Sequence, residues 1–196
     1  MTQLSQYVRI VSDTRNEPGR LNQVVFELSK PNSSNKVLMR VIEPDAHADS
    51  IKVVIVNAEK FHAAWRRGVT KNNVHFEVAN GNAQSWKMDR KYKLAEAGFL
   101  EQSINPDNQP VKLALVGCIL AEPKKTFTHR IKCMIGIKPK KEENYQVGFS
   151  DGITRTIWLI ANGYEEFPVK CQNGEDLLLA AAGATNSKIF QPYPNM

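Results

Sequence analysis

The chain has 196 residues, of which 42% are hydrophobic and 23% charged, and it carries a formal net charge of +6. A chain of this length and composition can bury a hydrophobic core, which excludes a disordered or fibrous protein and favours a single domain. No run approaches the roughly 18 to 20 apolar residues that span a bilayer, and the N-terminal residues lack the apolar core of a signal peptide, so we expect a cytoplasmic protein without membrane insertion.

The first predicted elements are strands. Apolar runs at 24–28 and 37–42 flank a loop at 31–35 that holds proline, asparagine and serine, and this order predicts a β-hairpin. A third strand is expected at 51–56, and Asn57 after it is a suitable N-cap for a short helix. Phe61, Ala64 and Trp65 share one face of that helix, which indicates a buried face.

The short helix ends with Arg66 and Arg67, which either complement the helix dipole or contact DNA. Residues 74–78 predict a further strand. Residues 89–104 predict a helix, in which Gly98 is a weak point or an early stop. A loop at 105–110 with two prolines then separates this helix from a strand expected at 111–116.

A basic segment follows. Residues 124–141 hold seven lysines and arginines and no acidic residue. Apolar residues alternate from Phe127 to Ile137, which predicts a strand with one buried and one basic face. Such a strand either follows the phosphate backbone of a nucleic acid or is a solvated edge strand protected by its lysines. The residues assigned to nucleic-acid binding are Lys124, Lys125, Arg130, Lys132 and Lys138.

The most informative stretch is residues 145–171. Apolar and polar residues alternate from 145 to 150, which predicts a half-buried strand that ends at Asp151 and Gly152. Apolar positions then recur at helical spacing, Gly163 can end this helix in the left-handed conformation, and a further strand starts at 167–169. The apolar stripe expected on the helix is Ile153, Ile157, Ile160 and Ala161.

The turn at 151–156 is a candidate phosphate site. A helix start leaves its first N–H groups without partners, and Gly152 has no Cβ, so an anion can approach the backbone of Ile153 and Thr154. The helix dipole and Arg155 would assist. Alternatively, Gly152 only makes the turn and Arg155 pairs with a carboxylate such as Glu165.

The last elements are a short helix at 175–184 and a flexible tail at 185–196, which holds two prolines and no apolar period. No internal repeat or linker interrupts the chain, so residues 1–184 are expected to form one domain. The three cysteines lack CxxC spacing and the four histidines lack HxH or HxxxH pairs, which favours buried reduced thiols over disulfides or a metal centre. The cysteines are Cys118, Cys133 and Cys171.

Residues 145–171 resemble the G-x-x-R signature of the ParB/sulfiredoxin fold, in which a strand ends in glycine, a helix starts with an arginine and an IPV-like strand follows. More narrowly, SDGITRTIWLIANG with FPV after it, and MDRKYKLAEAGF with an Asn-Pro segment, resemble the plasmid fertility-inhibition factors. The resemblance covers Met88 to Cys171. Ile153 and Thr154 stand where sulfiredoxins carry a catalytic cysteine, so sulfinic-acid reduction is not implied.

The resemblance implies a mixed α/β (α+β) domain of the ParB/sulfiredoxin type, with a mixed sheet and an elaborated N-terminal half. It implies a protein that blocks the conjugative or type IV secretion-dependent DNA transfer of a co-resident plasmid. It further implies ATPase and DNase activity, with ATP as the cofactor, Mg²⁺ as a further candidate and DNA as a partner.

In that mechanism the catalytic residues are Arg155, which would stabilise charge in the transition state, and Asp151, the nearest candidate base. Asp89 and Glu43 are the next carboxylates to consider. The residues assigned to phosphate and nucleotide binding are Gly152, Ile153, Thr154 and Thr156.

Two other functions are compatible with the same residues. One is a non-enzymatic inhibitor whose basic strand docks on the coupling ATPase or another type IV secretion component. The other is a ParB-like DNA-binding regulator without hydrolysis. The sequence leaves open the target plasmid, the preferred form of nucleic acid, the metal ligands and the oligomeric state.

Overall fold

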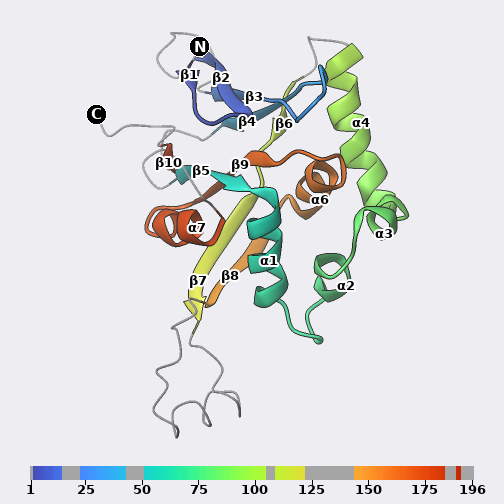
Figure 1. The fold of residues 1–196 in the computed structure, drawn as a ribbon, viewed down its shortest axis with the longest axis vertical. Coiled ribbons are helices and arrows are strands. Elements are labelled where there is room, and N and C mark those ends of the chain that lie inside the picture. Colours follow the sequence, from blue (N-terminus) through green and yellow to red (C-terminus); the bar gives the residue numbers. More distant parts are fainter. Residues whose placement is uncertain are drawn as a thin grey trace, which may run out of the picture.

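The structure, a computed structural model, describes residues 2–14, 23–42, 51–104, 109–121, 144–183 and 189–190. Its strands form two mixed five-stranded sheets, and the helices pack against the second sheet, against one another and in one case against the first sheet (Figure 1). The mixed α/β class is confirmed. The expectation of one sheet is wrong, because the N-terminal half builds a sheet of its own.

The first sheet has the strand order β1-β2-β3-β4-β6. The predicted hairpin is confirmed, since β3 and β4 pair antiparallel from Leu28 and Val37 onwards, whereas β1 and β2 were not predicted. Strand β6 joins parallel to β4 and makes the sheet mixed. The strands are β1 Thr2–Gln3, β2 Val8–Asp13, β3 Gln23–Leu28, β4 Val37–Ile42 and β6 Val111–Lys112.

The second sheet has the order β10-β5-β9-β7-β8, in which only β9 and β7 are parallel. Strand β10 lies in the segment expected to be a flexible tail and pairs with β5, so that expectation does not hold at these two residues. The strands are β5 Ile51–Asn57, β7 Leu115–Ala121, β8 Asn144–Asp151, β9 Glu166–Gln172 and β10 Ile189–Phe190.

The chain passes from the first sheet to the second between Lys112 and Leu115. The predicted strand at 111–116 is therefore two strands, β6 and β7, in different sheets. Leu113 N donates to the carbonyl of Arg40 in the first sheet at 2.9 Å, and Lys170 N of the second sheet donates to the carbonyl of Ala114 at 2.9 Å. Leu113 and Ala114, which join β6 to β7, are both buried.

Six helices are described: α1 Ala58–Gly68, α2 Phe76–Ala79, α3 Ala83–Lys87, α4 Arg90–Ile104, α6 Ile153–Ala161 and α7 Asp176–Gly183. The prediction for α1 is confirmed, because the Asn57 side chain accepts from Lys60 N at 3.1 Å and the predicted face is buried. The strand predicted at 74–78 is wrong. Asn73 instead starts a turn that leads into α2, accepting from His75 N and Phe76 N.

The two arginines at the end of α1 bind neighbouring backbone. Arg66 Nε donates to the carbonyl of Ala79 at 3.2 Å, and Arg67 Nε donates to the carbonyl of Tyr145 at 3.1 Å. They therefore tie α1 to α2 and to β8. Gly98 does not stop α4, which continues to Ile104.

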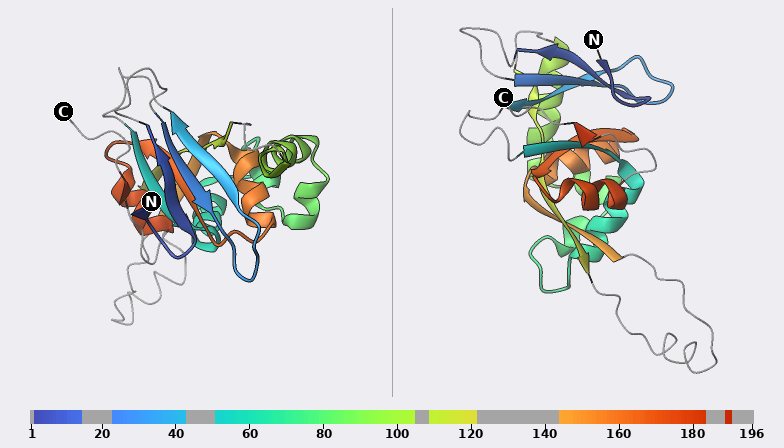
Figure 2. Two further views of the ribbon diagram at one scale, coloured as in Figure 1. Left: turned by 90° about the horizontal axis from the view of Figure 1, so that it is seen from above. Right: turned by 90° about the vertical axis from the view of Figure 1, so that its left-hand side faces the viewer.

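Helix α4 connects the two sheets. It spans from β4 of the first sheet to α6, which rests beside the second sheet (Figure 2). Phe99 of α4 stacks on Trp158 of α6 with 4.2 Å between ring centroids, and Asn162 Nδ2 donates to Tyr92 Oη at 2.9 Å. Of the predicted stripe on α6, only Ile157 is fully buried, while Ile153, Ile160 and Ala161 are partly buried against the core. The other buried residues of α6 are Thr156, Trp158 and Leu159.

Cys118 and Cys171 are buried free thiols, as predicted, and Cys133 lies outside the described residues. Burial raises the pKa of Cys118 to about 11 and that of Cys171 to about 12. These thiols are therefore neutral near pH 7 and are poor nucleophiles. In the part of the chain that the structure describes, no helix is long and apolar enough to cross a bilayer.

Phe99 should be a principal contact between α4 and α6. Because its ring is fully buried against Trp158, Phe99→Ala should lower the free energy of unfolding by about 3–5 kcal/mol in urea denaturation. The control is Leu100→Ala on the same helix, where a half-exposed side chain should cost below about 1 kcal/mol. Equal losses in the two variants would contradict this packing.

Candidate functional site

The turn between β8 and α6 is built around Gly152. Its φ of 90° and ψ of 13° are left-handed, a conformation that glycine adopts without strain, and it stands at the N-cap of α6. A Cβ built on Gly152 would lie 2.6 Å from both Cα and Cβ of Ala114. Position 152 therefore requires glycine for two reasons: the backbone has a positive φ, and Ala114 leaves no room for a Cβ.

This contact gives another reason why residue 152 has no Cβ. The sequence suggested that the absent Cβ admits an anion to the backbone. In the structure the Cβ direction is occupied by Ala114, with the Arg155 guanidinium also only 2.9 Å away. A side chain at position 152 would therefore disturb the packing of the turn, so a Gly152 substitution does not report on anion binding alone.

Thr156 holds the turn together from inside. Its hydroxyl donates to the carbonyl of Gly152 at 3.2 Å, its backbone N–H donates to the same oxygen at 3.1 Å, and the residue is buried. Thr156 therefore lies away from the surface that a phosphate would reach. No side chain caps the first turn of α6, and the N–H groups of Ile153 and Thr154 at the start of a helix have no intrahelical partner.

Arg155 forms an ion pair with Asp151, one helical turn earlier. The Arg155 side chain is 19% exposed and that of Asp151 is 69% exposed, so the arginine is held partly inside while the carboxylate faces water. The alternative partner considered for Arg155, Glu165, is not the one it contacts. An anion that binds Arg155 therefore competes with Asp151 for guanidinium N–H groups.

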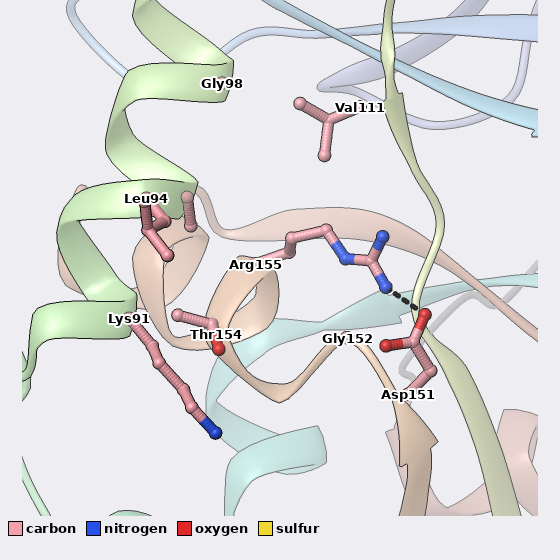
Figure 3. A pocket seen from close by; sticks show the side chains of 9 residues that line it. Lys91, Leu94, Gly98, Val111, Asp151, Gly152, Thr154 and Arg155 are labelled. Carbon is pink, nitrogen blue, oxygen red and sulfur yellow. Dashed lines mark hydrogen bonds and ion pairs between the residues drawn. The ribbon is translucent and has the colours of Figure 1, made fainter.

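A pocket of about 430 Å³ opens beside this turn. Asp151, Gly152, Thr154 and Arg155 line one side of it. The other side comes from α4 and β6, and Figure 3 shows Thr154 between the α4 residues and the Arg155–Asp151 pair. The lining residues on this second side are Lys91, Leu94, Ala95, Gly98 and Val111.

The side of the pocket that α4 provides was not predicted from the sequence. Residues 91, 94, 95 and 98 have the spacing of one helical face, which was visible in the sequence. Leu94 on this face is 67% exposed and lines the pocket. The contribution of Val111 had no sequence signal, because it depends on β6 joining β4.

Of the other carboxylate candidates, Asp89 is not among the residues that line the pocket. Asp89 accepts from Lys91 N at 2.6 Å and caps the start of α4, and Glu43 lies outside the described residues. Among the nine lining residues Asp151 is the one carboxylate. The described segments contain no cluster of three His, Cys, Asp or Glu side chains suited to a metal ion.

The basic segment at 124–141 lies outside the described residues, together with Lys124, Lys125, Arg130, Lys132 and Lys138. The residues that flank it are described. Ala121 and Asn144 pair at one end of the β7–β8 ribbon, whereas Asp151 ends β8 at the other. Seven steps of strand rise separate Asn144 from Asp151 by about 23 Å.

The comparisons with known proteins agree with one another. The profile described as "PFIN: Plasmid Fertility inhibition factor" matches residues 53–183, which include the whole pocket. The crystal structure of the oncogenic suppression activity protein, a plasmid fertility inhibition factor, as its gold(I) cyanide derivative, has a similar fold. The TM-score is 0.64 at 25% identity, over 96% of this chain and 80% of that one. No curated protein matches the chain significantly.

Two glycines with positive φ provide a matched test of the turn. At Gly163 φ is 79° and a Cβ would meet nothing within 4 Å, so Gly163→Ala should lose only the left-handed strain, about 1–2 kcal/mol. Gly152→Ala should lose clearly more in denaturant unfolding, because the clash with Ala114 adds to the same strain. Equal losses would show that Ala114 does not restrict this position.

Proposed function

The chain belongs to the plasmid fertility inhibition factor family, and we propose that it inhibits plasmid DNA transfer through phosphate-ester hydrolysis at the turn from Gly152 to Arg155. The substrates would be ATP and DNA of a conjugative or type IV secretion-dependent transfer system. The observation that carries this proposal is that Arg155 and the uncapped start of α6 border the same 430 Å³ pocket.

We assign the β8–α6–β9 unit to the ParB/sulfiredoxin type. The support is local: a strand ends at a left-handed glycine, an arginine lies in the first turn of the helix, and the strand Glu166–Gln172 follows. Ile153 and Thr154 follow Gly152, and the described cysteines are buried in strands β7 and β9. The assignment therefore extends to phosphate chemistry and not to cysteine redox chemistry.

The proposed roles follow from position. The N–H groups of Ile153 and Thr154 would bind phosphate oxygens at the positive end of α6. Arg155, already oriented along the pocket wall, would stabilise the charge that grows on the transferred phosphoryl group. When the phosphate binds Arg155, Asp151 would lose this ion pair and become hydrated. Its exposed carboxylate would then orient the attacking water.

The protein groups at the pocket would hold Mg²⁺ only together with the phosphates of a bound nucleotide. Magnesium is commonly held by one or two carboxylates together with substrate phosphates, and among the described residues that line the pocket Asp151 is the one carboxylate. When bound, the ion would neutralise phosphate charge. Arg155 pairs with Oδ2 of Asp151, so the ion would bind through the other carboxylate oxygen or displace the arginine.

The size and lining of the pocket suit a nucleotide. Its volume lies within the roughly 300–1,000 Å³ of ordinary ligand sites. The wall of Leu94, Ala95, Gly98 and Val111 is apolar, which suits a base or the face of a sugar. Lys91 at the edge adds a second cation on the side opposite Arg155.

Arg155→Ala should reduce nucleotide or DNA hydrolysis by on the order of 10²-fold or more, with little change in melting temperature. Arg155→Lys should recover only part of the rate, since an ammonium group cannot bind phosphate in a bidentate manner. The control is Lys112→Ala, an exposed cation that does not line the pocket. Wild-type turnover in folded Arg155→Ala would remove the assignment.

Arg155→Ala also distinguishes the enzymatic function from the two alternatives, docking and DNA-binding regulation. If Arg155→Ala loses hydrolysis and also loses inhibition of plasmid transfer, the enzymatic proposal is supported. Full inhibition by the inactive variant would instead favour docking on the coupling ATPase or another type IV secretion component. Salt-sensitive DNA binding without hydrolysis by the wild type would favour a ParB-like regulator.

Gly98 tests the apolar wall. A Cβ there meets only Val111 Cγ2 at 3.7 Å, so Gly98→Ala should bind ATP normally. Gly98→Leu should fill the pocket and weaken ATP at least about tenfold while leaving inorganic tripolyphosphate binding within about twofold. Calorimetric titration measures both ligands. An equal loss of the two would mean that the phosphate site itself was disturbed, and unchanged ATP binding would place the nucleotide elsewhere.

A further inference from the structure

The junction of α3 and α4 carries four exposed cations: Lys87, Arg90, Lys91 and Lys93. They lie within seven consecutive residues, in which Asp89 is the one acid. The carboxylate of Asp89 is engaged as the cap of α4. Within the described segments, none of the four cationic side chains has a hydrogen-bond or ion-pair partner.

Arg90, Lys91 and Lys93 lie in the first turn of α4, where cations are unfavourable, whereas Lys87 lies in the last turn of α3. The N-terminal end of a helix carries partial positive charge, so acids stabilise it and cations destabilise it. Two other helices of the chain follow this rule: α1 has Glu59 in its first turn with cations in its last, and α7 starts with Asp176. Helix α4 has no acid in its first turn, and Asp89 at its cap is the one acid that faces three cations there. A local rule that is broken in this way is expected where function needs the charge.

The four cations adjoin the pocket. Lys91 lines the pocket on the same face of α4 as Leu94, and α3 and α4 both pack against α6. Met88 and Leu94 beside the cations are 85% and 67% exposed, which gives apolar surface for unstacked bases. By contrast, the described residues that flank the basic segment at 124–141, Ala121 and Asn144, pair at the end of β8 opposite Gly152.

We propose that Lys87, Arg90, Lys91 and Lys93, the α4 cationic patch, bind the phosphate backbone of single-stranded DNA and direct one nucleotide into the pocket. This inference rests on the proposed function of the pocket. A single strand is favoured over a duplex, because the pocket has room for about one nucleotide and a paired base would first have to leave its helix.

The test compares two triple variants of equal charge change. Lys87→Gln/Arg90→Gln/Lys93→Gln alters the patch but leaves Lys91 in the pocket. The control, Lys60→Gln/Lys71→Gln/Lys112→Gln, removes three exposed lysines outside the patch. Fluorescence anisotropy with a labelled mixed-sequence single strand is measured over a salt series, and circular dichroism compares the folds.

The patch variant should bind at least about tenfold more weakly, with a log K against log salt slope shallower by about two, since each single-strand phosphate contact contributes about 0.7. The control should stay within about twofold of the wild type. The melting temperature of the patch variant should stay close to that of the wild type, because removing Arg90 and Lys93 favours the start of α4 whereas removing Lys87 takes a cation from the last turn of α3. An equal loss of DNA affinity in both triple variants would mean that only net charge matters, and it would contradict the proposed role of the α4 cationic patch.

A competitor separates the partner classes. Polyglutamate of the same charge as the DNA should displace it poorly if the patch recognises a phosphate backbone. Equally good displacement would overturn the nucleic-acid assignment in favour of an acidic protein surface. Unaltered DNA binding by the patch variant, with Arg155→Ala still inactive, overturns the patch and leaves the proposed site intact. A wild type that binds no DNA overturns both the patch and the DNA part of the proposed function.

Discussion

The contact between Gly152 and Ala114 is the constraint on which the site depends. Ala114 lies where the chain passes from the first sheet to the second, and its carbonyl also receives the N–H of Lys170 from β9. With Ala114 fixed in this way, a left-handed glycine is the residue that can end β8 beside it and start α6. One close approach thus sets the direction of α6 and the position of Arg155.

Helix α4 completes the site from the outside. The stacking of Phe99 on Trp158 holds α4 against α6, so the face with Lys91, Leu94 and Gly98 stands opposite the turn. The pocket is therefore formed by regular elements with buried contacts, which suits a site that must hold a phosphate group in one geometry. The Arg155–Asp151 pair orients the cation before any ligand arrives.

The sequence predicted those parts of the structure that have local causes. The strand, glycine turn, helix and strand of residues 145–171 follow from alternation, a positive-φ glycine and helical spacing, and all four were found. The strand at 74–78, the single strand at 111–116 and the single sheet were wrong, because turns and strand partners far away in sequence decide them. The pocket wall formed by α4 and Val111, and the contact of Gly152 with Ala114, likewise depend on residues far apart in sequence.

The most direct measurement of the central claim is a ¹⁵N NMR titration of the protein with Mg²⁺ and a non-hydrolysable ATP analogue. The amide signals of Ile153 and Thr154 should move most, since their N–H groups are proposed to bind the phosphates, and the Gly98 signal should move with them from the opposite wall. Inorganic tripolyphosphate should move the first two and leave Gly98 nearly unchanged. Saturable shifts confined to residues outside this pocket would contradict the account.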